Sequence, residues 1–114
     1  MIQRLQCGPR MSQAVVHGNT VYLAGQVASD TSADVAGQTR QVLAAIDALL
    51  AEAGTDKTKV LTATIYLADI TTFGEMNSEW DAWVPAGNTP ARATVEARMV
   101  APAYKVEIQV VAAR

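Results

Sequence analysis

The sequence predicts an α+β fold, a mixed β-sheet with two helices packed on one face. Apolar and polar residues alternate with the period of a strand in the segments 14–27, 60–67, 91–98 and 105–113. Apolar residues recur at spacings of three and four, the period of a helix, in the segments 34–53 and 72–84. The chain has 114 residues, 50% of them hydrophobic, and no linker interrupts it. We therefore expect a single domain spanning residues 1–114.

The segment 14–27 is typical of a β-hairpin. Two β-rich runs are joined by Gly18-Asn19, a pair suited to the positive φ angles of a two-residue turn. A loop follows near residues 28–32. The stretch LQCGPR, residues 5–10, which contains the single cysteine Cys7, is interpreted as a loop.

The segment 34–53 predicts a long amphipathic helix, with Gly54 where a C-cap glycine belongs. The segment 60–67 then alternates as a strand with one buried face. Strand, long helix and strand in this order indicate a crossover connection.

The segment 72–84 predicts a second helix that ends before Pro85. Thr72 and Glu75 have the spacing of a capping box. One stripe of this helix is apolar, and we interpret it as core that packs on the sheet: Phe73, Met76, Trp80 and Trp83.

The segments 91–98 and 105–113 predict the last two strands. Their small or apolar residues should face the helices, so the opposite face of the sheet would carry Thr, Tyr, Gln, Arg and Glu side chains. A chain of this length leaves that face uncovered by its own helices. We therefore expect a homo-oligomer with clefts between its subunits.

Composition excludes several classes of function. Nine Lys and Arg against eleven Asp and Glu give a net charge of −2, and the basic residues are scattered, so we expect no nucleic-acid partner. No stretch has the length or apolarity of a signal peptide or membrane span, so we expect a cytoplasmic protein without a membrane partner. One cysteine and one histidine, Cys7 and His17, favour neither a metal site nor a nucleophilic triad.

The residue that stands out is Arg92, which enters a strand directly after Pro90-Ala91. Its guanidinium binds a carboxylate bidentately and never loses its charge, which suits the anchoring of a small acid. Glu107 belongs to the polar set of the last strand. If the two strands were neighbours, this cation and this carboxylate would share a pocket; a purely structural Arg–Glu pair explains the same residues.

Three segments, RMSQAVVHGNTVYLAGQV, TPARATVEA and YKVEIQVVAA, together resemble the Rid or YjgF family of reactive-intermediate deaminases. The most specific match is Pro90-Ala91-Arg92 followed, at the family's separation, by Lys105-Val106-Glu107-Ile108. The resemblance implies a chorismate-mutase-like fold and a homotrimer with active sites at the subunit interfaces.

For the site, the resemblance implies that Arg92 holds the carboxylate of a 2-imino or 2-enamino acid and that Glu107 positions or activates water. The products would be a 2-keto acid and ammonia, and no cofactor or metal is required. Asn77 matches a family position near the site.

The chain also departs from the best-characterised deaminase group, which has a tyrosine, a serine and a cysteine at three site positions. Here these positions hold Met11 or Arg10, Ala24 and Thr94. We expect Met11, Ala24 and Thr94, with Asn77, to contact the substrate. Because the tyrosine, serine and cysteine of that group are all lost, an alternative is a non-catalytic protein that binds small carboxylates such as 2-keto acids through the same arginine.

Overall fold

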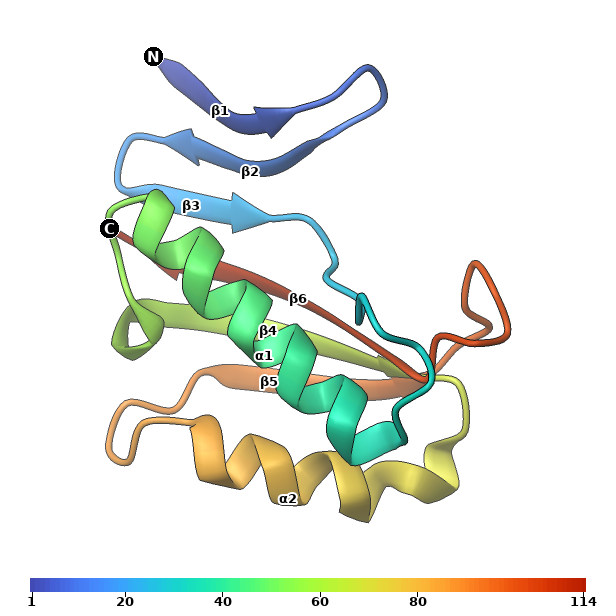
Figure 1. Ribbon diagram of the computed structural model, residues 1–114. Coiled ribbons are helices and arrows are strands. Elements are labelled where there is room, and N and C mark those ends of the chain that lie inside the picture. The colour runs from blue at the N-terminus through green and yellow to red at the C-terminus, as the bar shows by residue number, and fades with distance from the viewer.

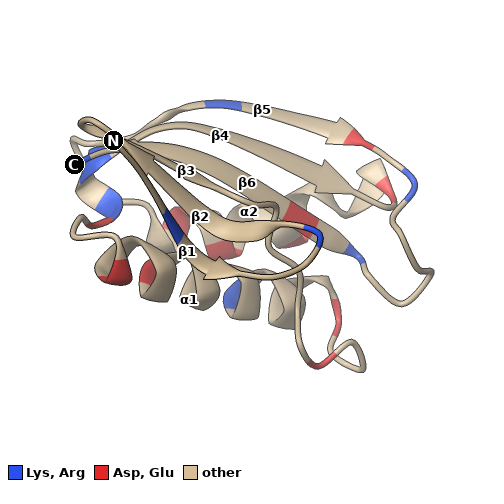
Figure 2. Cartoon of the chain, turned by 90° about the horizontal axis from the view of Figure 1, so that it is seen from above, with Lys and Arg blue, Asp and Glu red and all other residues tan.

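The computed structural model describes residues 1–114 and confirms the predicted α+β fold (Figure 1). Six strands form one sheet in the order β1-β2-β3-β6-β4-β5, and every neighbouring pair is antiparallel except β4 and β5. Both helices cover the same face of the sheet (Figures 1 and 2). The elements are β1 (Ile2–Cys7), β2 (Ser12–His17), β3 (Thr20–Leu23), α1 (Val35–Glu52), β4 (Val60–Leu67), α2 (Phe73–Trp83), β5 (Ala91–Glu96) and β6 (Val106–Ala113).

The predicted hairpin is confirmed as β2 and β3, with Gly18 at a φ of 61° in the turn. Its second strand is shorter than predicted, because β3 ends at Leu23 and beyond it only Gln26 forms a bridge, with Ile108. Strand β1 was not predicted, and the interpretation of residues 5–7 as part of a loop was wrong. Only Leu5 of this strand is partly buried, because β1 is an edge strand with both faces exposed. Its backbone pairing with β2 forms it, and such a strand has no alternation of apolar and polar residues to read.

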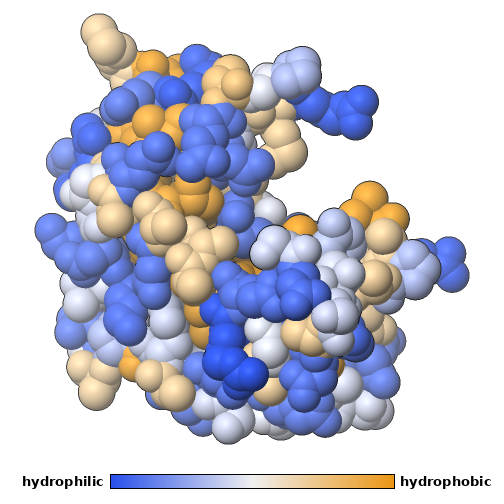
Figure 3. Space-filling model, viewed as in Figure 1, coloured by the Kyte–Doolittle hydropathy of each residue, from blue (hydrophilic) through white to orange (hydrophobic).

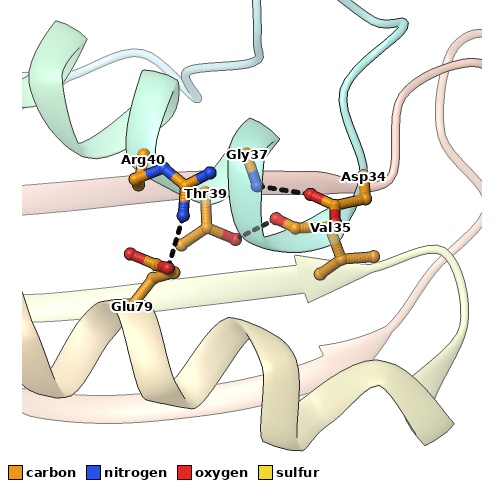
Figure 4. A network of polar contacts seen from close by, with 6 residues as sticks. All are labelled: Asp34, Val35, Gly37, Thr39, Arg40 and Glu79. Atoms are coloured by element: carbon orange, nitrogen blue, oxygen red, sulfur yellow. Dashed lines mark hydrogen bonds and ion pairs between the residues drawn. The ribbon is translucent and has the colours of Figure 1, made fainter.

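Helix α1 begins where the sequence predicts, because the Asp34 carboxylate accepts a hydrogen bond of 2.8 Å from the Gly37 amide (Figure 4). Its apolar stripe packs on the sheet, and Gly54, with a φ of 83°, follows its last turn. An ion pair between Arg40 and Glu79 joins α1 to α2 (Figure 4). The predicted crossover runs from β3 through α1 to β4, with β6 between the two strands.

Helix α2 has the predicted extent, but two predictions for its N-terminal part were wrong. The Thr72 hydroxyl donates to the Asp69 carbonyl instead of capping α2, so the capping box does not form. Phe73 remains 39% exposed, whereas Met76 and Trp80 are buried in the core. The apolar stripe of α2 is therefore divided, since its first aromatic ring lies outside the core.

The core lies between the helices and one face of the sheet, where buried apolar side chains form one cluster of 21 residues. The other face has no helix, and Tyr22 and Val95 on it are 47% and 43% exposed. We call this the open face. No helix of the structure is both long and apolar enough to cross a membrane.

Candidate active site

Arg92 is held by helix α2. On β5 it lies opposite Ala63, which is buried beneath the helices, so the Arg92 side chain extends on the helix side of the sheet. Its Nη1 donates a hydrogen bond of 2.7 Å to the Oδ1 of Asn77. Its Cζ lies 5.2 Å from the ring centre of Trp80 and 5.7 Å from that of Phe73. One hydrogen bond and two cation–π contacts therefore fix a guanidinium that has further N–H donors available.

Glu107 lies on the opposite side of the sheet. It pairs with Tyr66 of β4, and both side chains point to the open face. Its carboxylate packs directly over Gly25, where the Cβ of any other residue would overlap it. Together with Tyr66 and Gln109, Glu107 lines a cavity of about 270 Å³. The alternation of strand residues did not reveal this contact, because what matters at Gly25 is the absence of a side chain.

The structure does not bring Arg92 and Glu107 together within one chain. Their strands β5 and β6 lie on either side of β4, and their partners on β4, Ala63 and Tyr66, are three positions apart and so face opposite ways. A pocket shared by Arg92 and Glu107 within one chain required their strands to be neighbours, and β4 separates them. A structural Arg92–Glu107 pair is absent too, since the ion pair of this chain joins Arg40 to Glu79.

The prediction that arginine belongs to the face opposite the helices was wrong as well. Arg92 and Thr94 lie on the helix side of β5. Their partners on β4, Ala63 and Ile65, lie on the same side of the sheet. The Thr94 hydroxyl is buried there without a hydrogen-bond partner. A buried polar atom without a partner is rare in folded proteins, so this position is unusual.

Of the remaining predicted residues, Asn77 faces Arg92 as described, and Ala24 and Met11 lie elsewhere. Ala24 follows β3 and precedes Gly25, and its amide donates to the Gln13 carbonyl. Met11 is 49% exposed and lines a groove of about 580 Å³ between the β1–β2 loop and α1, which Gly25 also lines. The hollow is open at the surface beside the β1–β2 loop (Figure 3). Arg92 and Thr94 do not line this groove.

The groups with shifted titration lie outside these places. The pKa values of three exposed aspartates are lowered, chiefly because a hydroxyl two residues later donates a hydrogen bond to the carboxylate: Asp30 beside Ser32, Asp56 beside Thr58 and Asp69 beside Thr71. Each belongs to a turn that precedes a helix or 3-10 segment. They stabilise local structure and do not form a reactive cluster.

Comparison with known proteins matches the whole chain. A family model described as endoribonuclease L-PSP matches residues 1–114. The chain is 48% identical to the RutC family protein YoaB of Escherichia coli over 112 residues, which covers 98% of this chain and 97% of that protein. It is 35% identical over 107 residues to a rat protein named 2-iminobutanoate/2-iminopropanoate deaminase, covering 89% of this chain and 77% of the rat protein.

Solved structures agree with these matches. The crystal structure of a YjgF family member from Neisseria meningitidis superposes with a TM-score of 0.98 at 47% identity, covering 100% of this chain and 95% of that one. A member of the same family from Mycobacterium tuberculosis gives a TM-score of 0.91 at 28% identity, with both chains fully covered. The chain therefore belongs to the Rid (YjgF-like) family, as its Pro-Ala-Arg and Lys-Val-Glu-Ile segments indicated.

Proposed function

We propose that the protein is a cofactor-independent hydrolytic deaminase that converts reactive 2-imino and 2-enamino acids to 2-keto acids and ammonia. The observation that carries this proposal is the restrained guanidinium of Arg92. One nitrogen of the guanidinium donates to Asn77, and two aromatic rings lie beside the group. Its orientation is therefore fixed, and its remaining N–H donors can bind one carboxylate bidentately. The rat relative, which is named for this chemistry, supports the choice of reaction.

The active site of this proposal is formed by two chains. Arg92 lies on the helix side of the edge strand β5, and Glu107 lies on the open face, so one chain does not present both to one small molecule. Exposed Tyr22 and Val95 make the open face suited to cover by a second copy. We infer that Arg92 of one subunit and Glu107 of its neighbour meet across the interfaces of a homotrimer.

The reaction consists of water addition followed by loss of ammonia. Arg92 holds the substrate carboxylate, and the Glu107 carboxylate accepts a proton from the water whose oxygen bonds to C2 of the imine. Glu107 returns that proton to the nitrogen, which gives the neutral carbinolamine. The carbinolamine hydroxyl then passes its proton through Glu107 to the nitrogen while the C2–N bond breaks and the C2=O bond forms, and the 2-keto acid and ammonia leave. An enamine first gains a proton at C3 and loses one from its nitrogen, which converts it to the imine. Positioning and proton transfer are contributions that such a site supplies without a cofactor.

The other predicted residues have smaller parts in this proposal. Asn77 acts through Arg92, whose orientation it fixes. Thr94 lies on the same side of β5 as Arg92 with its hydroxyl buried, and we propose that it bounds the substrate site there. Met11 and Ala24 present no polar side-chain group. We propose that Met11, which lines the groove with Gly25, shapes the cleft, and that Ala24, the residue before Gly25, contributes only backbone there.

Ribonuclease activity, which the description of the family model names, is not the function we propose. The net charge is −2, and Lys and Arg are dispersed over the molecule rather than gathered in one stripe (Figure 2). A surface that binds an RNA backbone needs a continuous positive potential, and a small carboxylate needs only one arginine.

The test is release of 2-keto acid and ammonia from 2-iminopropanoate and 2-iminobutanoate generated in situ. We expect the wild type to exceed the buffer rate, Arg92→Ala to lose about 100-fold or more in kcat/KM because two charge-assisted hydrogen bonds disappear, and Arg92→Lys to recover part of it. Lys59→Ala, an exposed charge outside the site, is the matched control. A wild type no faster than buffer contradicts the deaminase. If 2-oxobutanoate still raises its Tm, and Arg92→Ala abolishes that shift, the protein is a carboxylate-binding one.

A further inference from the structure

A second arginine shares the cavity of Glu107 within the same chain. Arg98 follows β5, and its backbone is placed by the amide of the preceding residue, Ala97, which donates to the carbonyl of Leu67. With Tyr66, Glu107 and Gln109 from the open face it lines the cavity of about 270 Å³. No sequence motif singles out Arg98, which lies two residues beyond the end of β5.

The two charges in this cavity are not used by the fold. The ion pair of this chain joins Arg40 and Glu79, and neither Arg98 nor Glu107 makes a side-chain hydrogen bond. Arg98 also lines the larger hollow of about 630 Å³ formed by the loop between β5 and β6. Arg98 is exposed and its guanidinium carries a permanent charge, so a cation that no carboxylate of the chain pairs lines the same cavity as Glu107.

We propose that Arg98 binds a second carboxylate of the substrate, so that the site prefers 2-imino dicarboxylic acids. This inference rests on the proposed function, in which Arg92 of the neighbouring subunit already holds the carboxylate next to the imine. A second carboxylate near Glu107 would be repelled unless a cation offsets it, and Arg98 is the cation that lines this cavity.

The size of the cavity agrees with a short dicarboxylate. At about 30 Å³ for each water-sized group, 270 Å³ accommodates about nine such groups, close to the number of heavy atoms in a dicarboxylic acid of four or five carbons. Ala97 and Met99 offer apolar contacts for the methylene groups between the two carboxylates. A planar guanidinium then matches the distal carboxylate bidentately.

The experiment compares 2-iminoglutarate with 2-iminobutanoate, each generated in situ by a flavin oxidase from the corresponding amino acid. The quantity measured is the ratio of kcat/KM for the dicarboxylic to that for the monocarboxylic substrate. We expect Arg98→Gln to lower this ratio about 10- to 100-fold. Arg98→Lys should lower it less, because lysine keeps the charge and loses only the paired N–H donors of the planar guanidinium. Lys59→Gln, which removes an exposed charge elsewhere, should leave the ratio unchanged.

Binding of the unreactive products gives a second readout that does not depend on turnover. By calorimetry, 2-oxoglutarate should bind the wild type more tightly than 2-oxobutanoate, and Arg98→Gln should remove that difference. An unchanged ratio and an unchanged difference in affinity overturn the role of Arg98 and leave the deaminase standing. Equal losses for both substrates show that Arg98 holds the carboxylate next to the imine, which also overturns it. Turnover of neither substrate contradicts the proposed function, while calorimetry still decides the role of Arg98.

Discussion

Mixing two inactive variants tests the two-chain active site directly. Arg92→Ala chains keep Glu107, and Glu107→Ala chains keep Arg92. Because these residues lie on opposite faces of one sheet, a site assembled across an interface needs Arg92 from one chain and Glu107 from the next. Each variant alone should be inactive, and oligomers that contain both should regain activity.

The expected recovery follows from the symmetry of the assembly. In a cyclic trimer that contains both variants, the three interfaces differ, and only one of them joins an intact Arg92 to an intact Glu107. Activity per trimer should therefore be about one third of the wild-type value, whereas a mixed dimer would recover about one half. One measurement thus reports both the composition of the site and the number of subunits.

The two variants are co-expressed with different affinity tags, and the doubly tagged oligomers are isolated and assayed for 2-keto acid release from 2-iminobutanoate. Co-expression of Arg92→Ala with the double variant that lacks both residues is the matched control and should give no activity. Doubly tagged oligomers without activity would refute the reasoning, since a site built within one chain carries a defect in every subunit of the mixture.

Three further predictions concern the environment of these residues. Gly25→Ala should abolish deaminase activity and displace the Glu107 carboxylate, because the new methyl group overlaps it; a crystal structure of the variant checks the displacement, and full activity would contradict it. Thr94→Val should raise the free energy of unfolding by about 1 kcal/mol while lowering kcat/KM, because it removes a buried hydroxyl that has no partner. Denaturant unfolding and the imine assay measure the two effects. A loss of stability would show that the hydroxyl has a hydrogen-bond partner. Thr71→Ala should raise the pKa of Asp69, which is lowered mainly by the Thr71 hydroxyl. Since the folded pKa lies below the unfolded value of about 3.8, Asp69 stabilises the fold above that pH and loses this contribution as the pH falls; NMR titration of the carboxylate would detect it, and an unchanged pKa would exclude the hydroxyl as its cause.

Local patterns determined most of the secondary structure. The hairpin turn at Gly18-Asn19 and the helix that begins at Asp34 depend on residues close together in sequence, so their signals are complete in the chain itself. Strand β1 escaped prediction because it is formed only by hydrogen bonds to β2, which any side chains permit. The same limit applies to Gly25 and Arg98, whose importance comes from neighbours distant in sequence.

The sequence by itself therefore determined the family, the two helices and the residues that carry the proposed chemistry. Only the tertiary structure decided which way those residues face. Alternation divides β5 into two sets of residues, but it does not say which set meets the helices. The usual expectation that the apolar set turns inward fails at β5, an edge strand whose Arg92 packs against Trp80 of α2. Arg92 lies beneath that helix, held by its aromatic rings and Asn77, while Val95 and the other small residues of β5 remain on the open face, where we propose that a second copy covers them.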